Sequence, residues 1–178
     1  MKRCVEMCAT ACLAALIAAP CRAGEVSDYL TKDGKLKAAV TLRFGAHGLM
    51  AAGGPKLKAE VWVIEPTGEW TRQIAPAKGK LSAKQLAALA QHLATQDFNS
   101  LPRQQGYQSA ALDEVFQYVL IGFGQKQTTF NFKIGESPTD YLPKAGDPSA
   151  AAWSRFVALE LVLGQMLQES EFKEKKEK

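Results

Sequence analysis

Few side chains in this sequence have the chemistry to bind a metal or to act as a nucleophile. Its 178 residues include two His, at positions 47 and 92, and four Cys, all within the first 21 positions. Cys4-x3-Cys8-x3-Cys12 resembles the closely spaced thiolates of an iron–sulfur site, but the segment around it is apolar. A catalytic zinc ion takes three N, S or O ligands, and the sequence has no H-E-x-x-H. We therefore expect no metal and no cofactor.

Three short glycine motifs come close to catalytic or phosphate-binding patterns without completing them. Gly135-Glu-Ser-Pro138 lacks the second glycine of G-x-S-x-G. Gly48 to Gly53 has the spacing of a P-loop, but Gly54 stands where the phosphate-binding Lys is required, and Gly122-Phe-Gly124 lacks the third glycine of a dinucleotide loop. All three are interpreted as turns, and we expect a protein that is not an enzyme.

Carboxylates leave one enzymatic alternative open. Asp113 and Glu114 are adjacent, so on a strand they point to opposite faces and form no acid–base pair by themselves. A small hydrolase could still use Asp113, Asp140 or His47 in a site that no motif reveals. The sequence favours a binding function over this alternative because no complete catalytic constellation is recognisable.

The first 23 residues have the pattern of a secretory signal. Lys2 and Arg3 precede an apolar stretch of 11 residues, Ala9–Ala19, which is too short to span a bilayer as a helix. Small residues then precede a predicted cleavage site between Ala23 and Gly24. We expect an exported protein, periplasmic or extracellular, and a lipid anchor on Cys21 is the alternative.

Cleavage changes the composition that matters for function. The removed segment carries three basic residues, one acidic residue and every Cys, so the mature chain has 155 residues, a net charge of +2 and no disulfide. A charge of +2 is too small for a nucleic-acid footprint. We therefore expect no nucleic-acid partner. Beyond the signal no long apolar run is evident, so no stable membrane span is expected either.

Alternation and capping signals predict five strands and two helices. Ser82-Ala-Lys-Gln85 is a capping box that starts the first helix, with Leu81 and Leu86 as a hydrophobic staple. Asp147-Pro148 starts the second helix, which is predicted to end near Gln168. The strands are predicted at 35–44, 56–64, 69–74, 113–123 and 127–134.

The element order is therefore βββ-α-ββ-α. Short connections favour antiparallel pairing, so we predict an α+β fold: a five-stranded antiparallel sheet with both helices packed on one face. One domain would span residues 35–168, after the signal peptide (1–23) and a loose N-terminal lead-in (24–34). Residues 169–178 carry four Glu and four Lys and are expected to form a charged, solvated tail.

Apolar residues in exposed places indicate a protein interface. If Leu57, Ala59, Val61 and Val63 face inward, then Trp62 and Ile64 occupy the outer face of the second strand. His47, Leu49 and Met50 fall in the Gly-rich connection that precedes it. These five residues are the candidate partner-binding set, and core packing under a lid is the alternative interpretation.

Basic residues gather on the outer face of the first two predicted strands. They are Lys35, Lys37, Arg43, Lys56 and Lys58. Such a face could bind an anionic partner, and the alternative is that these charges solvate and protect an exposed strand edge.

The chain also resembles the emfourin-type proteins, small bacterial inhibitors of thermolysin-like metalloproteases. The shared pattern covers about residues 40–134: a Gly-rich stretch after the first strand, Leu81-Ser82 with Leu86 and Leu89, Phe98, Leu101-Pro102, Asp113 and Tyr118. The glycine pair Gly53-Gly54 comes later than the family usually has it. The resemblance implies an exported binding domain, and no inhibitory residue is carried over.

Taken together, these features predict an exported, non-enzymatic binding domain. Its Gly-rich loop and exposed sheet face would contact a partner protein, and a secreted protease that it inhibits is one candidate. A structural component of the cell envelope is the second hypothesis, and the small hydrolase is the third.

Overall fold

A computed structural model describes residues 24–47, 59–108, 115–140, 147 and 149–176. The described strands are β1 (Val40–His47), β2 (Glu60–Ile64), β3 (Glu69–Arg72), β4 (Ala77–Lys80), β5 (Gln104–Gly106), β6 (Phe116–Phe123) and β7 (Lys126–Lys133). The helices are α1 (Ala83–Thr95) and α2 (Ala150–Lys176), and two short 3₁₀ turns lie at Val26–Asp28 and Phe98–Ser100. The predicted signal peptide lies outside the described residues.

Within the described chain, the seven strands form one sheet in the order β4-β3-β2-β1-β6-β7-β5. Every neighbouring pair is antiparallel except β5 and β7, which run parallel. The α+β class is confirmed, but the predicted five-stranded antiparallel sheet is wrong. The two strands that were missed, β4 and β5, are short edge strands whose sequences have few β-branched or aromatic residues.

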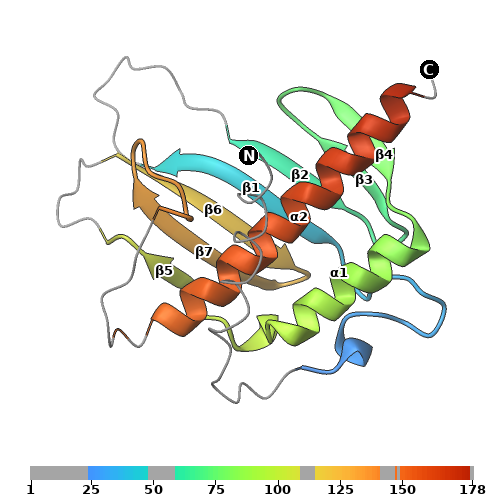
Figure 1. Cartoon of the computed structure of the whole chain (residues 1–178), viewed down its shortest axis with the longest axis horizontal. Coiled ribbons are helices and arrows are strands. Elements are labelled where there is room, and N and C mark those ends of the chain that lie inside the picture. The colour runs from blue at the N-terminus through green and yellow to red at the C-terminus, as the bar shows by residue number, and fades with distance from the viewer. Residues whose placement is uncertain (1–23, 48–58, 109–114, 141–146, 148, 177–178) are drawn as a thin grey trace, which may run out of the picture.

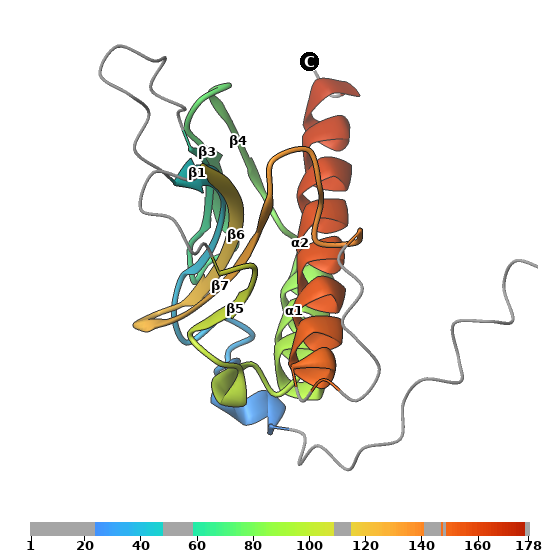
Figure 2. The same ribbon diagram turned by 90° about the vertical axis from the view of Figure 1, so that its left-hand side faces the viewer.

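Both helices lie on one face of this sheet (Figure 2). The capping box that starts α1 is present: Ser82 Oγ accepts from the amide of Gln85, whose side chain accepts from the Ser82 amide. At the other end of α1, the guanidinium of Arg155 in α2 donates to the carbonyl oxygens of Gln96 and Asp97, each at 2.7 Å. Arg155 thus binds two carbonyl oxygens just beyond the end of α1, of which that of Asp97 also accepts from the Ser100 amide, and it joins the two helices.

α2 crosses the sheet diagonally, passing over both of its halves (Figure 1). Phe156, Leu159, Leu163 and Leu167 recur at helical spacing and are at most 1% exposed, so this stripe forms the contact with the sheet. The helix continues past the predicted end near Gln168 as far as Lys176, and Ser170 is 4% exposed. Part of the predicted solvated tail is therefore packed against the sheet.

α2 also has the length and composition of a membrane-spanning helix. Its segment from Ala150 to Phe172 is long and apolar enough to cross a membrane. Core helices of globular domains share this length and composition. Here the most apolar stripe of α2 is packed against the sheet.

The register of β2 shows which of its faces is buried. Leu42 of β1 is paired with Trp62, and Val40 is paired with Ile64, so all four side chains lie on the helix-covered face. Trp62 is 8% exposed and Ile64 is 1% exposed. The predicted outward orientation of Trp62 and Ile64 is wrong, and Val61 lies on the other face instead.

Candidate functional site

The second face of the sheet is not covered by any described helix (Figure 2). Residues that alternate with the buried positions point to this open face, namely Thr41 and Arg43 of β1 and Leu120 of β6. They line a depression of about 560 Å³ that spans the middle of the sheet. The open face of the sheet, with this depression, is the candidate binding site.

The lining of the depression combines aliphatic and polar side chains. Its aliphatic part consists of Ala59, Val61, Ile74 and Leu120, of which Ile74 is 43% exposed. Its polar part consists of Arg43, Thr41, Gln73 and Gln127. Exposed apolar groups surrounded by hydrogen-bonding groups are typical of a protein interface.

Arg43 is held by an aromatic ring. Its guanidinium carbon lies 5.7 Å from the centroid of the Tyr118 ring. Tyr118 is paired with Gly45, and a Cβ at Gly45 would come within 2.6 to 2.8 Å of the Tyr118 ring and hydroxyl. Only a residue without a Cβ allows the ring to lie across β1 at this point, beside Arg43 two residues earlier on the same face.

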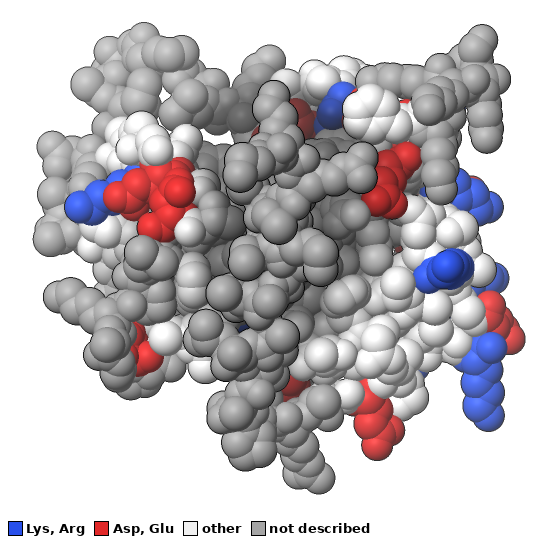
Figure 3. All heavy atoms as spheres, viewed as in Figure 1, with Lys and Arg blue, Asp and Glu red and all other residues white. Residues whose placement is uncertain are grey.

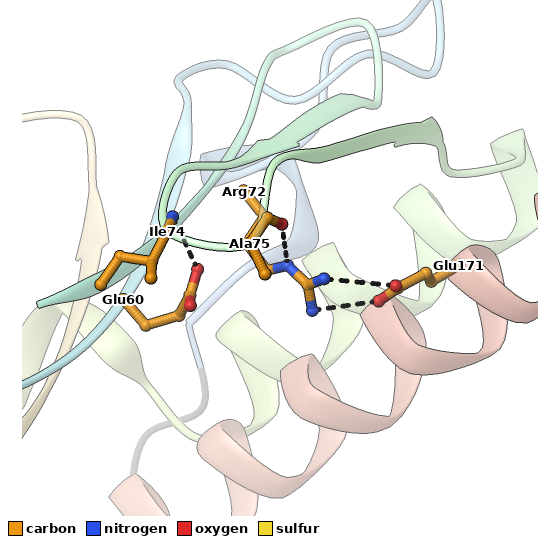
Figure 4. Close-up of polar contacts among 5 residues, drawn as sticks. All are labelled: Glu60, Arg72, Ile74, Ala75 and Glu171. Carbon is orange, nitrogen blue, oxygen red and sulfur yellow. Dashed lines mark hydrogen bonds and ion pairs between the residues drawn. The ribbon is translucent and has the colours of Figure 1, made fainter.

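The turn between β3 and β4 forms one rim of the depression. The amide of Ile74 donates to Glu60 Oε1 at 3.3 Å, and Arg72 Nε donates to the carbonyl of Ala75 at 2.7 Å (Figure 4). These two bonds fix the turn from its two sides. These hydrogen bonds therefore hold in place the backbone that carries the exposed side chain of Ile74.

Arg72 connects this turn to α2. Its two terminal nitrogens donate to the two carboxylate oxygens of Glu171 at 3.2 and 3.3 Å (Figure 4). Its guanidinium carbon lies 4.7 Å from the centroid of the Trp62 ring, which in turn lies 5.3 Å from that of Trp70. We call Arg72, Trp62 and Trp70, together with Ser170 and Glu171, the covered-face stack.

Trp70 completes the covered-face stack at the sheet edge. Its Nε1 donates to Ser170 Oγ at 2.9 Å, and the Ser170 hydroxyl lies 3.3 Å from the carbonyl oxygen of Lys80 in β4. A Cβ at Gly79, the β4 residue paired with Trp70, would lie 2.5 Å from the indole ring. The glycine therefore makes room for the largest side chain in the core.

Positive charge dominates the described open face. By register, the charged side chains there are Arg43, Lys78, Lys80 and Lys133, with Glu69 as the acidic member, paired across the strands with Lys80. On the opposite, helical side, the described acidic and basic side chains are interspersed around the margin of the molecule (Figure 3). The excess of cations on the open face favours an anionic ligand.

The described residues bring together no group of three or more His, Cys, Asp or Glu that could hold a metal ion. Asp140 accepts hydrogen bonds from the Ser137 hydroxyl at 2.7 Å and from the Ser137 amide at 2.8 Å. These bonds lower the pKa of Asp140, so the carboxylate remains ionised and is a weak base. The Ser137–Asp140 contact belongs to an exposed turn.

Of the five predicted partner-binding residues, the structure describes the side chains of two, Trp62 and Ile64. Trp62 and Ile64 are in the core, as described above. His47 is the last residue of β1 and its side chain lies outside the described residues, as do Leu49, Met50 and Asp113. Arg43 was recognised from its alternation, whereas Val61, Ile74 and Leu120 were missed because only the register reveals that they share a face.

Comparison with protein-family models finds no match for this chain, and comparison with curated proteins finds none either. The function must be inferred from the geometry.

Proposed function

We propose that this chain is an exported, non-enzymatic binding domain whose open sheet face holds a segment of a partner protein. The observation that carries the proposal is the depression of about 560 Å³, where half-buried aliphatic side chains surround the ring-supported Arg43. Export rests on the signal pattern of residues 1–23.

The composition of the face supports a protein partner rather than a nucleic acid. Single-stranded nucleic acids bind to sheets by stacking bases on exposed aromatic rings. Tyr118, the aromatic residue beside Arg43, is only 3% exposed, so its ring has no free face to offer. Within the depression itself, the described apolar lining is aliphatic, from Ala59, Val61, Ile74 and Leu120, and these side chains suit those of a polypeptide.

A secreted protease is the specific partner suggested by the emfourin resemblance. Under this proposal, the domain would bind the protease through the open face and would not itself break or form covalent bonds. Inhibition of proteases from the same extracellular space is therefore the first activity to measure.

The experiment compares two exposed aliphatic residues on opposite sides of the molecule. Ile74→Asp changes the rim of the depression, and Leu161→Asp changes α2, where the leucine is 54% exposed. The chain from Gly24 to Lys178 is immobilised, exported proteins are captured, and the dissociation constant of each captured partner is measured by calorimetry.

We expect a partner that binds the unchanged chain and the Leu161→Asp variant equally, and binds Ile74→Asp at least about tenfold more weakly. Thermal melts of all three proteins confirm that each variant is folded. Equal affinity for Ile74→Asp and the unchanged chain would refute the proposed binding face.

A further inference from the structure

The molecule contains two arginines that are held against aromatic rings, one on each face of the sheet. Arg72 lies over Trp62 at 4.7 Å, and Arg43 lies over Tyr118 at 5.7 Å. In both places a ring limits the positions that the guanidinium can take, which lowers the entropy lost when an anion binds.

The two arginines differ in what meets the charged end. Glu171 approaches Arg72 with both carboxylate oxygens, which is the two-point geometry that a guanidinium favours. Among the described residues, Arg43 forms no ion pair, although its side chain is exposed in a depression. The acidic group that completes the arrangement on the covered face therefore has no counterpart on the open face.

The surroundings of Arg43 suit a carboxylate that arrives with apolar neighbours. Thr41, Gln73 and Gln127 line the same depression and can donate further hydrogen bonds, and no described Asp or Glu lines it. The rest of the described lining is aliphatic, and the residues paired with Arg43 on its two neighbouring strands are Val61 and Leu120. A phosphate-rich ligand would be expected to meet several cations in the depression, whereas Arg43 is the one cation among its described lining residues.

We propose that Arg43 recognises an Asp or Glu side chain of the partner, and that an adjacent aliphatic residue of the same segment packs on Ile74 and Leu120. This inference rests on the proposed function and specifies its ligand: an acidic, aliphatic segment of a protein. Arg43 is the specificity-determining residue, and Tyr118 and Gly45 are positioning residues that act through it.

The test is a selection from a library of random 12-residue peptides displayed on phage, with the chain from Gly24 to Lys178 as bait. The library is selected in parallel on the unchanged protein, Arg43→Gln and Ile74→Asp. Peptides enriched on the unchanged protein are then synthesised with each Asp or Glu replaced by its amide. Affinities are measured for both peptide forms against each protein.

We expect the enriched peptides to contain an acidic residue next to an aliphatic one. Replacing that acid by its amide should weaken binding to the unchanged protein about tenfold, and binding to Arg43→Gln less than about twofold. Arg43→Lys keeps the charge but loses the planar fork, so an intermediate effect is expected.

The outcomes separate this inference from the proposed function. If peptides require Ile74 but show no acidic preference, or if Arg43→Gln keeps the full preference, the carboxylate assignment is wrong and the binding face stands. If no peptide depends on Ile74, the binding face itself is wrong. Displacement of a selected peptide by a thymidine 20-mer or by anionic lipid vesicles, but not by neutral vesicles, would overturn the protein ligand in favour of those anions.

Discussion

The covered-face stack and the Arg43 site contain the same three kinds of residue. They differ in whether a carboxylate of the described chain binds the arginine. Each has an arginine, an aromatic ring that holds it, and a glycine that makes room for a ring: Arg72, Trp62–Trp70 and Gly79 on one side, Arg43, Tyr118 and Gly45 on the other. On the covered face, α2 supplies Glu171 and closes the arrangement. On the open face no described carboxylate does so.

This difference separates stability from recognition. A guanidinium whose acidic partner belongs to the same chain contributes to folding. A guanidinium that lies against a ring but has no acidic partner within the described chain can contribute to binding instead, because the ring limits its positions before a ligand arrives. The same local design can therefore serve two purposes, depending on whether a helix covers it.

Removing the largest ring should have the largest effect on the covered side. Trp70→Ala is expected to lower the free energy of unfolding by about 3–5 kcal/mol, because it empties a fully buried position over Gly79. Trp70→Phe keeps most of the volume and loses only the bond to Ser170, so a smaller loss of about 1 kcal/mol is expected. Urea denaturation measures the free energy of unfolding of both variants. Equal losses would show that ring volume does not determine the stability at this position.

Shortening α2 tests whether its last turns belong to the fold. A chain that ends at Gln168 lacks Ser170 and Glu171, so Trp70 Nε1 loses its acceptor and Arg72 loses its carboxylate; the expected loss is about 2–4 kcal/mol. A chain that ends at Phe172 keeps both partners and should stay within about 0.5 kcal/mol of the full chain. Equal stability of the two shortened chains in denaturant would mean that Ser170 and Glu171 contribute nothing to the stability of the fold.

Substituting the two arginines in parallel tests the comparison directly. Arg72→Gln should lower the free energy of unfolding by about 1–2 kcal/mol, since it removes the ion pair with Glu171 and the hydrogen bond to the carbonyl of Ala75. Arg43→Gln should change it by less than about 0.5 kcal/mol. Thermal and urea unfolding of both variants decide the point. A large loss for Arg43→Gln would show that this residue, too, serves mainly the fold.

Glu160 is an acidic counterpart to Arg43. It is a half-buried carboxylate of α2 that forms no ion pair among the described residues. Burial raises the pKa of Glu160 above its usual value. The folded state therefore holds the proton more tightly than the unfolded state. The stability associated with the neutral form is complete below the unfolded pKa, about 4.3, and is lost as the pH rises through the folded pKa.

Glu160→Gln should therefore be slightly more stable than the unchanged chain at pH 7 and equal to it below about pH 4. Melting temperatures from pH 3 to pH 8 give the difference. Glu65→Gln, the same change at an exposed position, is the control for the removal of one carboxylate. A destabilised Glu160→Gln at pH 7 would indicate that the carboxylate is favourably bound.

The elements that could be predicted from the sequence are those whose signals are local. The capping box of Ser82 and Gln85 uses residues three apart, and the buried alternation of Thr128, Phe130 and Phe132 needs only period two. β2 could not be oriented in this way, because Val61, Trp62, Val63 and Ile64 are apolar on both faces. Pairing with Leu42 and Val40 of β1 decides which side is buried.

The rest depended on partners far away in the chain. Residues 77–80 form β4 because Gly79 accommodates Trp70 and because α2 supports the edge through Ser170. Ser170 and Glu171 lie in a run of charged residues whose composition alone is typical of a tail. The depression joins residues from β1, β2, β6 and β7, so its outline could not be predicted before the strand order was known.

The route of α2 has a consequence for how the chain matures. β1 and β6 form the central seam of the sheet although they are far apart in sequence, and α2 contacts the strands at both outer edges, β4 and β5. α2 is also the last of these elements to leave the ribosome. The sheet therefore lacks the helix that contacts both of its edges until synthesis is nearly finished. During that time, the apolar side chains of the sheet that Phe156, Leu159, Leu163 and Leu167 cover in the finished fold are exposed, so the incomplete chain is prone to aggregation.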